Sequence, residues 1–213
     1  AHANHCPILL LTSEPKMTEL AGLPRLPCLP AILGEQGFAT VYLQAAPMAF
    51  MSKDQFMPTS GFAQSFGDTS FGRAYNHNQW GIDDRAFFEQ SVEKIEELRQ
   101  GNKPWFLTLL NVGTHHPFNV PPDFEGSHTP GSAGWAMEYL DHAVGDFVRR
   151  LESLGVLDDT LVIIVNDESL REPQRHRSTA NRVFNKYIRK SDGGSAGDLE
   201  LVGVRAIRFG NKL

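Results

Sequence analysis

Short, almost entirely apolar segments alternate with amphipathic helical segments along most of the sequence. Residues 38–43, 104–110 and 160–165 have the length and the β-branched or aromatic content of buried strands. In residues 83–100 and 132–155, apolar side chains recur at helical spacing. Strands that are apolar on both faces and separated by amphipathic helices are typical of a parallel sheet covered on both sides. The sequence therefore predicts an α/β fold, a three-layer α/β/α sandwich with a mainly parallel sheet.

The predicted helices carry recognisable signals at their ends. Asp83 or Asp84 can cap the first long helix, and Gly155 can end the second. A shorter helix is expected over residues 29–37, where apolar side chains share one face and Gly37 provides a stop. The strand over residues 38–43 then follows directly.

The chain has 213 residues, of which 41% are hydrophobic and 21% charged, and this supports one ordinary globular domain. The longest apolar runs, at residues 7–11 and 161–165, are far shorter than the ~20 residues that a membrane helix needs. We therefore expect no membrane span, and the N-terminus shows no secretory signal. The two cysteines, Cys6 and Cys28, allow at most one disulfide and form no metal-binding motif.

The net charge of −5 is unevenly distributed along the chain. Residues 1–170 contain 10 basic and 21 acidic side chains, whereas residues 171–213 contain 10 basic and 4 acidic ones. The basic segment lacks the aromatic interleaving of many nucleic-acid-binding segments, so no nucleic-acid partner is expected. We divide the chain into a domain over residues 1–170 and a basic tail of uncertain fold over residues 171–213. Residues 171–190 are expected to pack poorly against the core.

In parallel sheets of this kind, ligands bind at the carboxyl ends of the strands. That rule directs attention to residues 44–54, 111–118 and 166–169. The second of these segments contains two adjacent histidines, His115 and His116. A histidine there can donate a hydrogen bond to a phosphoryl or sulfuryl oxygen, or protonate a leaving group. The alternative is a pair of surface loop histidines without chemistry.

Two carboxylates, Asp167 and Glu168, directly follow the third predicted strand. Carboxylates at such a place are costly unless they are paired, solvated or bound to a cation. Their hard oxygen ligands suit Mg²⁺, Mn²⁺ or Ca²⁺. The alternative is a helix cap or a solvated turn.

Several phrases in their order resemble one enzyme family. They are "LPAILGEQGFATVYLQA", "KDQFMPTSGF", "WGIDDRAFFEQSVEKIEEL", "PWFLTLLNVGTHHPF" and "AMEYLDHAVGDFVRRLESLGVLDDTLVIIVNDES". This succession resembles lipoteichoic acid synthases and phosphoglycerol transferases, which are sulfatase-like members of the alkaline phosphatase superfamily. The resemblance covers about residues 29–169 and implies an alkaline-phosphatase-like fold that is incomplete here.

The resemblance also implies roles for individual residues. His115 matches a histidine that contacts the substrate headgroup or the leaving group, and His116 beside it is a second substrate-binding candidate. Lys53 matches a basic residue that binds the phosphate. Asp167 matches a metal-binding aspartate, and Glu168 stands where the family usually has histidine. The implied cofactor is a divalent metal, Mn²⁺ or Mg²⁺, with Ca²⁺ and Zn²⁺ as alternatives.

The start of the chain departs from the family pattern. The family's nucleophile, a threonine, serine or modified cysteine, lies about nine residues before a Thr-Gly or Thr-Ser pair. Here that pair is Thr12-Ser13, and the count leads to Ala3, which cannot act as a nucleophile. Cys6 is at the wrong spacing. The first metal-binding acid is not found either, so the sequence implies a partial active site.

The function that the resemblance implies is metal-dependent phosphoryl or phosphoglycerol transfer, or hydrolysis of phosphate esters. Alternatives are a sulfatase and a catalytically incomplete domain that binds anions or a partner. The expected substrate is a phosphate or sulfate ester, either a phospholipid headgroup or an envelope glycan. The resemblance places the chain at the extracytoplasmic face of the cell envelope, in a parent protein that can be membrane-anchored.

Overall fold

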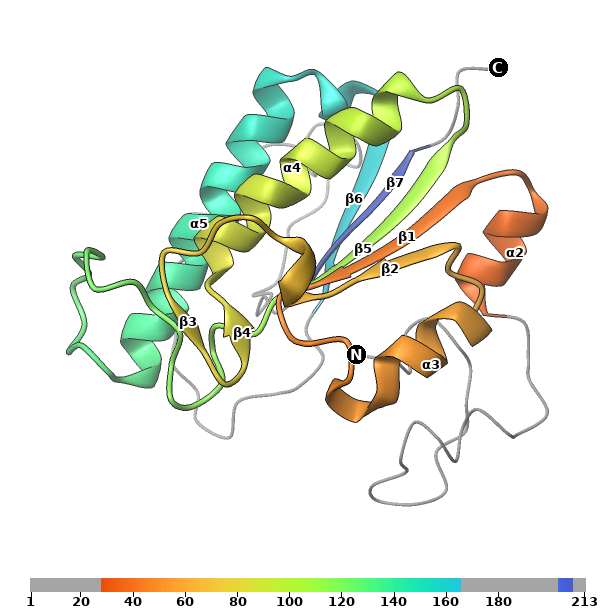
Figure 1. The fold of residues 1–213 in the computed structure, drawn as a ribbon. Helices are drawn as coiled ribbons and strands as arrows, with labels where there is room; N and C mark the ends of the chain where they lie inside the picture. The colour runs from red at the N-terminus through yellow and green to blue at the C-terminus, as the bar shows by residue number, and fades with distance from the viewer. Residues whose placement is uncertain (1–27, 166–202, 209–213) are drawn as a thin grey trace.

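A five-stranded sheet forms the middle layer of the computed structural model, which describes residues 28–165 and 203–208 (Figure 1). The strand order is β2-β1-β5-β7-β6. Strands β2 (Gln64–Phe66), β1 (Ala39–Gln44) and β5 (Trp105–Leu110) are parallel. Strand β7 (Gly203–Arg208) is antiparallel to both β5 and β6 (Thr160–Val165), so β6 runs in the direction of β5.

Helices cover both faces of this sheet. Helices α4 (Asp84–Gln100) and α5 (Ala133–Ser153) lie on one face, and α2 (Leu29–Glu35) and α3 (Lys53–Thr59) lie on the other (Figure 1). The expected three-layer α/β/α arrangement with a mainly parallel sheet is therefore confirmed.

Side chains of β1 and β5 alternate between the two layers because successive strand residues point to opposite faces. The core on the α4–α5 side includes Val41, Leu43, Trp105, Leu107, Leu109, Phe87, Ile95, Val144 and Leu151. The core on the α2–α3 side includes Tyr42, Phe106, Phe56, Met57 and Phe62. Strands buried on both faces explain the continuous apolar runs in the sequence.

The helix boundaries follow the capping signals. The Asp83 carboxylate accepts a hydrogen bond from the Ala86 N–H and caps α4, and Ser132 caps α5 by accepting one from the Trp135 N–H. After α5, Gly155 has φ 67°, a left-handed conformation that suits glycine.

The sheet also contains strands that the sequence patterns did not indicate. Strand β7 comes from the basic tail and separates β5 from β6, so the three predicted strands are not all neighbours. Strand β2 extends the parallel edge beside β1. The expectation that residues 171–190 pack poorly lies outside the described residues.

Short elements connect these layers: η1 (Phe50–Ser52), η2 (Asp68–Ser70), η3 (Val156–Asp158) and a hairpin of β3 (His77–Asn78) and β4 (Gly81–Ile82).

Cys28, before α2, is disulfide-bonded. Within the described ranges, no helix is both long and apolar enough to cross a membrane.

Candidate functional site

Three chain segments leave the sheet at the same edge. Strands β1, β5 and β6 run in one direction and end at Gln44, Leu110 and Val165. The β3–β4 hairpin and η1 lie beyond this edge (Figure 1). Ligands of such sheets bind at the carboxyl ends of the strands. Of the predicted residues, Lys53 begins α3 after the loop that leaves β1, and His115 lies in the loop that leaves β5.

The β3–β4 hairpin bridges these two loops. The Ile82 N–H donates to the carbonyl of Ala45 after β1, at 3.0 Å between N and O. The Asn119 side-chain amide, after β5, donates to the Gly81 carbonyl at 2.8 Å. Gly81 has φ 124°, and a Cβ there would lie 1.9 Å from the Ala45 oxygen, so only glycine allows this approach.

His115 lies on the exposed surface of the loop after β5, with its ring stacked on Trp80 of the hairpin. The ring centroids are 4.3 Å apart and the planes differ by 19°. The Trp80 indole N–H donates to the His116 carbonyl at 2.9 Å. The His116 ring instead packs edge-on against Phe118, with the centroids 5.5 Å apart. The two histidines therefore have different aromatic neighbours.

Lys53 is the first residue of α3 and is only 4% exposed. Its ammonium nitrogen lies 5.7 Å from the centroid of the Phe50 ring. Phe50 in turn meets Trp80 edge-on, with 5.5 Å between centroids. Lys53, Phe50, Trp80 and His115 thus form a continuous row of contacts, and we call Phe50 and Trp80 the aromatic bridge. The structure brings Lys53 and His115 to the two ends of this bridge.

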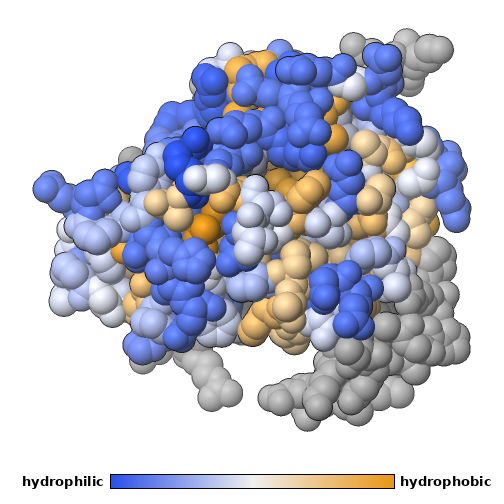
Figure 2. Space-filling view, in the orientation of Figure 1, coloured by the Kyte–Doolittle hydropathy of each residue, from blue (hydrophilic) through white to orange (hydrophobic). Residues whose placement is uncertain are grey.

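The turn before Lys53 has an unusual backbone. Met51 and Ser52 both have φ 56°, in the left-handed region that non-glycine residues rarely adopt. Such conformations store strain and are frequent at functional sites. Met51 and Phe50 are 48% and 42% exposed. Figure 2 shows hydrophobic surface across the middle of the face drawn, with hydrophilic residues around it.

A buried carboxylate supports the loop that carries His115. Asp84 is fully buried, and its Oδ1 accepts a hydrogen bond from the Gly113 N–H at 3.1 Å. Burial raises the pKa of Asp84 to about 7, although the Gly113 and Asn111 groups oppose that shift. Asp84 Oδ2 and Asn111 Nδ2 are both buried, and neither has a hydrogen-bond partner. Asp84 is thus poised to change its protonation state near neutral pH.

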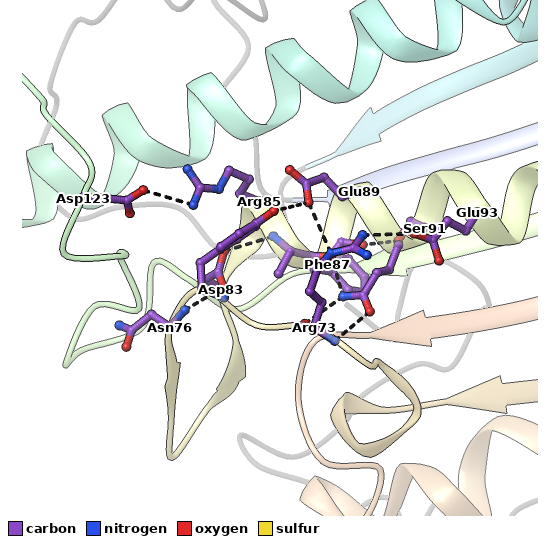
Figure 3. A network of polar contacts seen from close by, with 12 residues as sticks. Arg73, Asn76, Asp83, Arg85, Phe87, Glu89, Ser91, Glu93 and Asp123 are labelled. Carbon is purple, nitrogen blue, oxygen red and sulfur yellow. Dashed lines mark hydrogen bonds and ion pairs between the residues drawn. The ribbon is translucent and has the colours of Figure 1, made fainter.

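Asp83 fixes the chain that enters the hairpin (Figure 3). Its Oδ2 accepts hydrogen bonds from the N–H groups of Tyr75 and Asn76, at 2.7 and 2.9 Å. Its Oδ1 accepts from the Ala86 N–H and from the Tyr139 hydroxyl, at 3.0 and 2.7 Å. Burial, followed by the Asp83 charge, raises the pKa of Tyr139, which keeps the hydroxyl protonated as a donor.

Arg85 closes this network on the solvent side. Its guanidinium lies 3.7 Å from the centroid of the Tyr75 ring, and it pairs with Asp123 at 3.3 Å (Figure 3). The base of the hairpin is therefore anchored to the N-terminus of α4 and to α5 before it reaches the site.

The predicted metal ligands, Asp167 and Glu168, lie outside the described residues. Within residues 28–165 and 203–208, no three histidine, cysteine or acidic side chains gather into a group that could hold a metal ion. The metal site therefore stays a prediction.

Sequence patterns did not single out the aromatic bridge. Trp80 stands next to Gly81 at the start of the phrase that carries α4, but a lone tryptophan in a polar loop has no periodic signal. Its contact with His115, 35 positions later in the chain, exists only because the hairpin folds across the ends of β1 and β5.

Two solved structures share this fold. One is a protein of the alkaline phosphatase superfamily from Vibrio parahaemolyticus, with a TM-score of 0.64 and 18% identity over 91% of this chain and 45% of that one. The other is the lipoteichoic acid synthase LtaP from Listeria monocytogenes, with a TM-score of 0.63 and 21% identity over 85% of this chain and 46% of that one. The chain therefore shares the fold of these two proteins.

Sequence comparisons define the family to which the chain belongs. A family model described as Sulfatase matches residues 14–191, and the chain belongs to this family. Lipoteichoic acid synthase 1 of Bacillus subtilis (strain 168) is 27% identical over 169 residues. Phosphoglycerol transferase I of Escherichia coli (strain SMS-3-5 / SECEC) is 25% identical over 177 residues.

These two matches cover 75% and 78% of this chain but only 26% and 22% of the relatives. The chain thus spans about a quarter of the length of the curated relatives that it matches. The resemblance to this enzyme family is confirmed.

Proposed function

We propose that this chain supplies part of the active site of a phosphoryl or phosphoglycerol transferase, or of a related phosphate-ester hydrolase. Lys53 and His115 would contact the anionic ester. The observation that carries this proposal is that both residues follow the carboxyl ends of parallel strands and lie at the two ends of the aromatic bridge. The names of the two curated relatives support phosphate-ester chemistry.

The two side chains offer complementary chemistry to such an ester. The Lys53 ammonium is a compact positive charge with three donors, which suits a phosphate oxygen. It is largely buried, and a buried ammonium interacts more strongly with an anion than an exposed one does. The exposed His115 ring can donate a hydrogen bond to the ester or a proton to the leaving oxygen as the P–O bond breaks.

His116 is proposed as a second substrate-binding residue. Its ring packs against Phe118 rather than Trp80, so it would contact a different part of the ester from His115. Asp167 and Glu168 are proposed to hold a divalent metal, Mn²⁺ or Mg²⁺, with Ca²⁺ and Zn²⁺ as alternatives. When bound, such an ion would offset charge on the ester oxygens.

A second candidate is hydrolysis of sulfate esters, which the Sulfatase family model favours. A sulfate ester presents oxygens to Lys53 and His115 much as a phosphate ester does, so the donors alone do not select between the two. The smaller charge of a sulfate monoester is the property that a binding experiment can use to separate them.

Binding and turnover test these two candidates together. Glycerol phosphate and methyl sulfate are titrated into the full chain by calorimetry, and an aryl phosphate, an aryl sulfate and a phosphatidylglycerol analogue are assayed for turnover. We expect glycerol phosphate to bind more tightly than methyl sulfate. Lys53→Met and His115→Gln should weaken that binding, whereas the exposed His142→Gln on α5 should not. Equal binding by all four proteins would remove both residues from the site.

We also propose an extracytoplasmic location at the cell envelope. The disulfide at Cys28 supports it, because disulfides persist mainly in oxidising compartments. The name of the Bacillus subtilis relative points to envelope polymer synthesis. Protease digestion of a tagged chain tests this location in cells whose outer layers admit the protease and whose cytoplasmic membrane is intact. Full protection of the chain in such cells would contradict an extracytoplasmic location.

A further inference from the structure

Trp80 occupies the central position between the two residues that the proposed function assigns to the ester. One of its neighbours is the His115 ring, stacked at 4.3 Å, and another is the Phe50 ring, edge-on at 5.5 Å. Phe50 lies three residues before Lys53 and beneath its ammonium. A movement of the indole would therefore displace His115 directly and Lys53 through Phe50.

The hairpin that carries Trp80 is fixed on several sides. Its turn is closed by the Trp80 N–H, which donates to the Asn78 side-chain oxygen at 2.8 Å. The Asn78 amide donates to the Pro117 carbonyl at 2.8 Å, and the Trp80 indole N–H donates to the neighbouring His116 carbonyl. The bonds to the Pro117 and His116 carbonyls hold the hairpin tip against the backbone next to His115.

The base of the hairpin is held independently of its tip. The Asn76 amide donates to the Val120 carbonyl at 3.1 Å, and the Asp83 carboxylate binds the backbone N–H of Asn76. Ile82 bonds to the Ala45 carbonyl in the loop that leads to Lys53. The hairpin is therefore anchored to both strand-end loops, which are otherwise separate parts of the sequence.

His115 depends on this support for its orientation. The side chain is exposed, and an exposed side chain on a loop samples several rotamers unless a neighbour selects one. The nearly parallel stack on Trp80 restricts the imidazole to one plane. A donor held in one orientation binds its acceptor at a lower cost in conformational entropy.

We propose that Trp80 is a positioning residue, which fixes the His115 imidazole and, through Phe50, its separation from the Lys53 ammonium. This inference rests on the proposed function of the site, because Trp80 would act only through His115 and Lys53. Trp80 itself is assigned no contact with the ester. The ring of Trp80, rather than its indole N–H, is the part that positions His115.

The first test measures the stack without any ligand. In the full chain with labelled histidine, the His115 ring protons, assigned with His115→Gln, should resonate upfield of an unstacked histidine because they lie over the indole. Trp80→Ala should remove that shift, while Trp80→Phe should retain most of it although the N–H bond to His116 is lost. Trp135→Phe, which keeps a ring in the cluster that Trp135 shares with Phe124, is the control and should leave the shift unchanged.

The second test measures glycerol phosphate binding by the same variants. Trp80→Ala should weaken binding by about three- to tenfold, the change that corresponds to one lost aromatic pair. Trp80→Phe and the control Trp135→Phe should both bind glycerol phosphate like the parent. If Trp80→Ala does not fold, Trp80→Leu fills the space without an aromatic ring and takes its place.

The outcomes separate the two levels of inference. Two results would overturn the positioning role alone. One is an unshifted His115 resonance in the parent, and the other is parent-like binding by Trp80→Ala while His115→Gln binds weakly. Parent-like binding by both His115→Gln and Lys53→Met would overturn the proposed function, and the positioning role at the ester site with it. Weak binding by Trp80→Ala with rescue by Trp80→Phe would support both.

Discussion

The Asp84 carboxylate accepts a hydrogen bond from the backbone N–H of Gly113, with 3.1 Å between Oδ1 and N. Asp84 begins α4, and Gly113 lies two residues before His115. The bond thus ties the start of a core helix to the loop that carries the candidate histidine. Asp84 is fully buried, so the charge on this carboxylate affects the stability of the whole fold.

Asp84→Asn should change how stability depends on pH. Burial raises the pKa of Asp84 from 3.8 to about 7 in the folded protein, so the folded state holds this proton more tightly than the unfolded state does. Between about pH 4 and pH 7, rising pH therefore favours unfolding by up to about 4 kcal/mol from this group. Asparagine removes that effect and keeps an oxygen for the Gly113 N–H.

The measurement is urea unfolding of both proteins from pH 4 to pH 8. The stability of the variant relative to the parent should rise with pH through this range and level off above about pH 7. Glu97→Asn, at an exposed position of the same helix, is the control and should follow the parent. A constant difference between Asp84→Asn and the parent at every pH would contradict the raised pKa.

Gly113→Ala should destabilise the protein through the same contact. A Cβ at Gly113 would lie 2.3 Å from Asp84 Oδ2, which is far inside van der Waals contact, and both groups are buried. We expect a loss of about 2 kcal/mol or more, as for other overpacked buried sites. Gly72→Ala, where a Cβ meets nothing within 4 Å, should change stability by less than about 0.5 kcal/mol. Equal midpoints in urea for the two variants would exclude the clash.

The layers of this fold could be predicted from the sequence because each strand and helix has its own hydrophobic period. Strands β1, β5 and β6 and helices α4 and α5 were predicted to within a few residues, and Asp83 was one of two expected caps. The position of β7 could not be predicted, because its partners β5 and β6 are far away in the sequence. Tertiary pairing, rather than local pattern, places it.

The site was only partly accessible from the sequence. The strand-end rule and the family resemblance selected Lys53 and His115, which follow the carboxyl ends of β1 and β5 and are joined by the aromatic bridge. Trp80 and Asp84 were in quoted phrases, but Trp80 was assigned no role and Asp84 was considered only as a helix cap, since their contacts join residues about 30 positions apart. A hairpin of two-residue strands has too few residues for a periodic signal.

Ser52→Gly should stabilise the turn before Lys53. Ser52 has φ 56°, which costs a non-glycine residue about 1–2 kcal/mol, whereas glycine adopts it freely. Glycine also gains entropy in the unfolded chain, so the net gain should be about 0.5 kcal/mol. Ala49→Gly, three residues earlier in a right-handed conformation, should lose about 0.5–1 kcal/mol. Thermal or urea unfolding compares the two, and a loss of equal size at both positions would argue against strain at Ser52.

Tyr139→Phe should weaken the anchor of the hairpin. Its hydroxyl donates to the buried Asp83 carboxylate at 2.7 Å and accepts from the Arg85 N–H at 3.1 Å, so the substitution leaves two buried groups with one partner fewer. The expected cost is about 1–3 kcal/mol. Tyr75→Phe, which removes an exposed bond to Glu89, should cost less than about 0.5 kcal/mol. Similar losses for the two tyrosines would show that the buried bond contributes no more than the exposed one.

Mn²⁺ or Mg²⁺ should raise the thermal stability of the full chain if Asp167 and Glu168 hold a metal. A ligand that binds only the folded state stabilises it by RT ln(1 + [L]/Kd), or about 1.4 kcal/mol at ten times Kd. Asp167→Asn should abolish this gain, because a neutral amide is a weaker ligand for a hard cation. Asp146→Asn removes an exposed carboxylate from α5 and should retain the gain. Scanning calorimetry with and without each metal gives the answer, and an undiminished gain in Asp167→Asn would place any metal elsewhere in the protein.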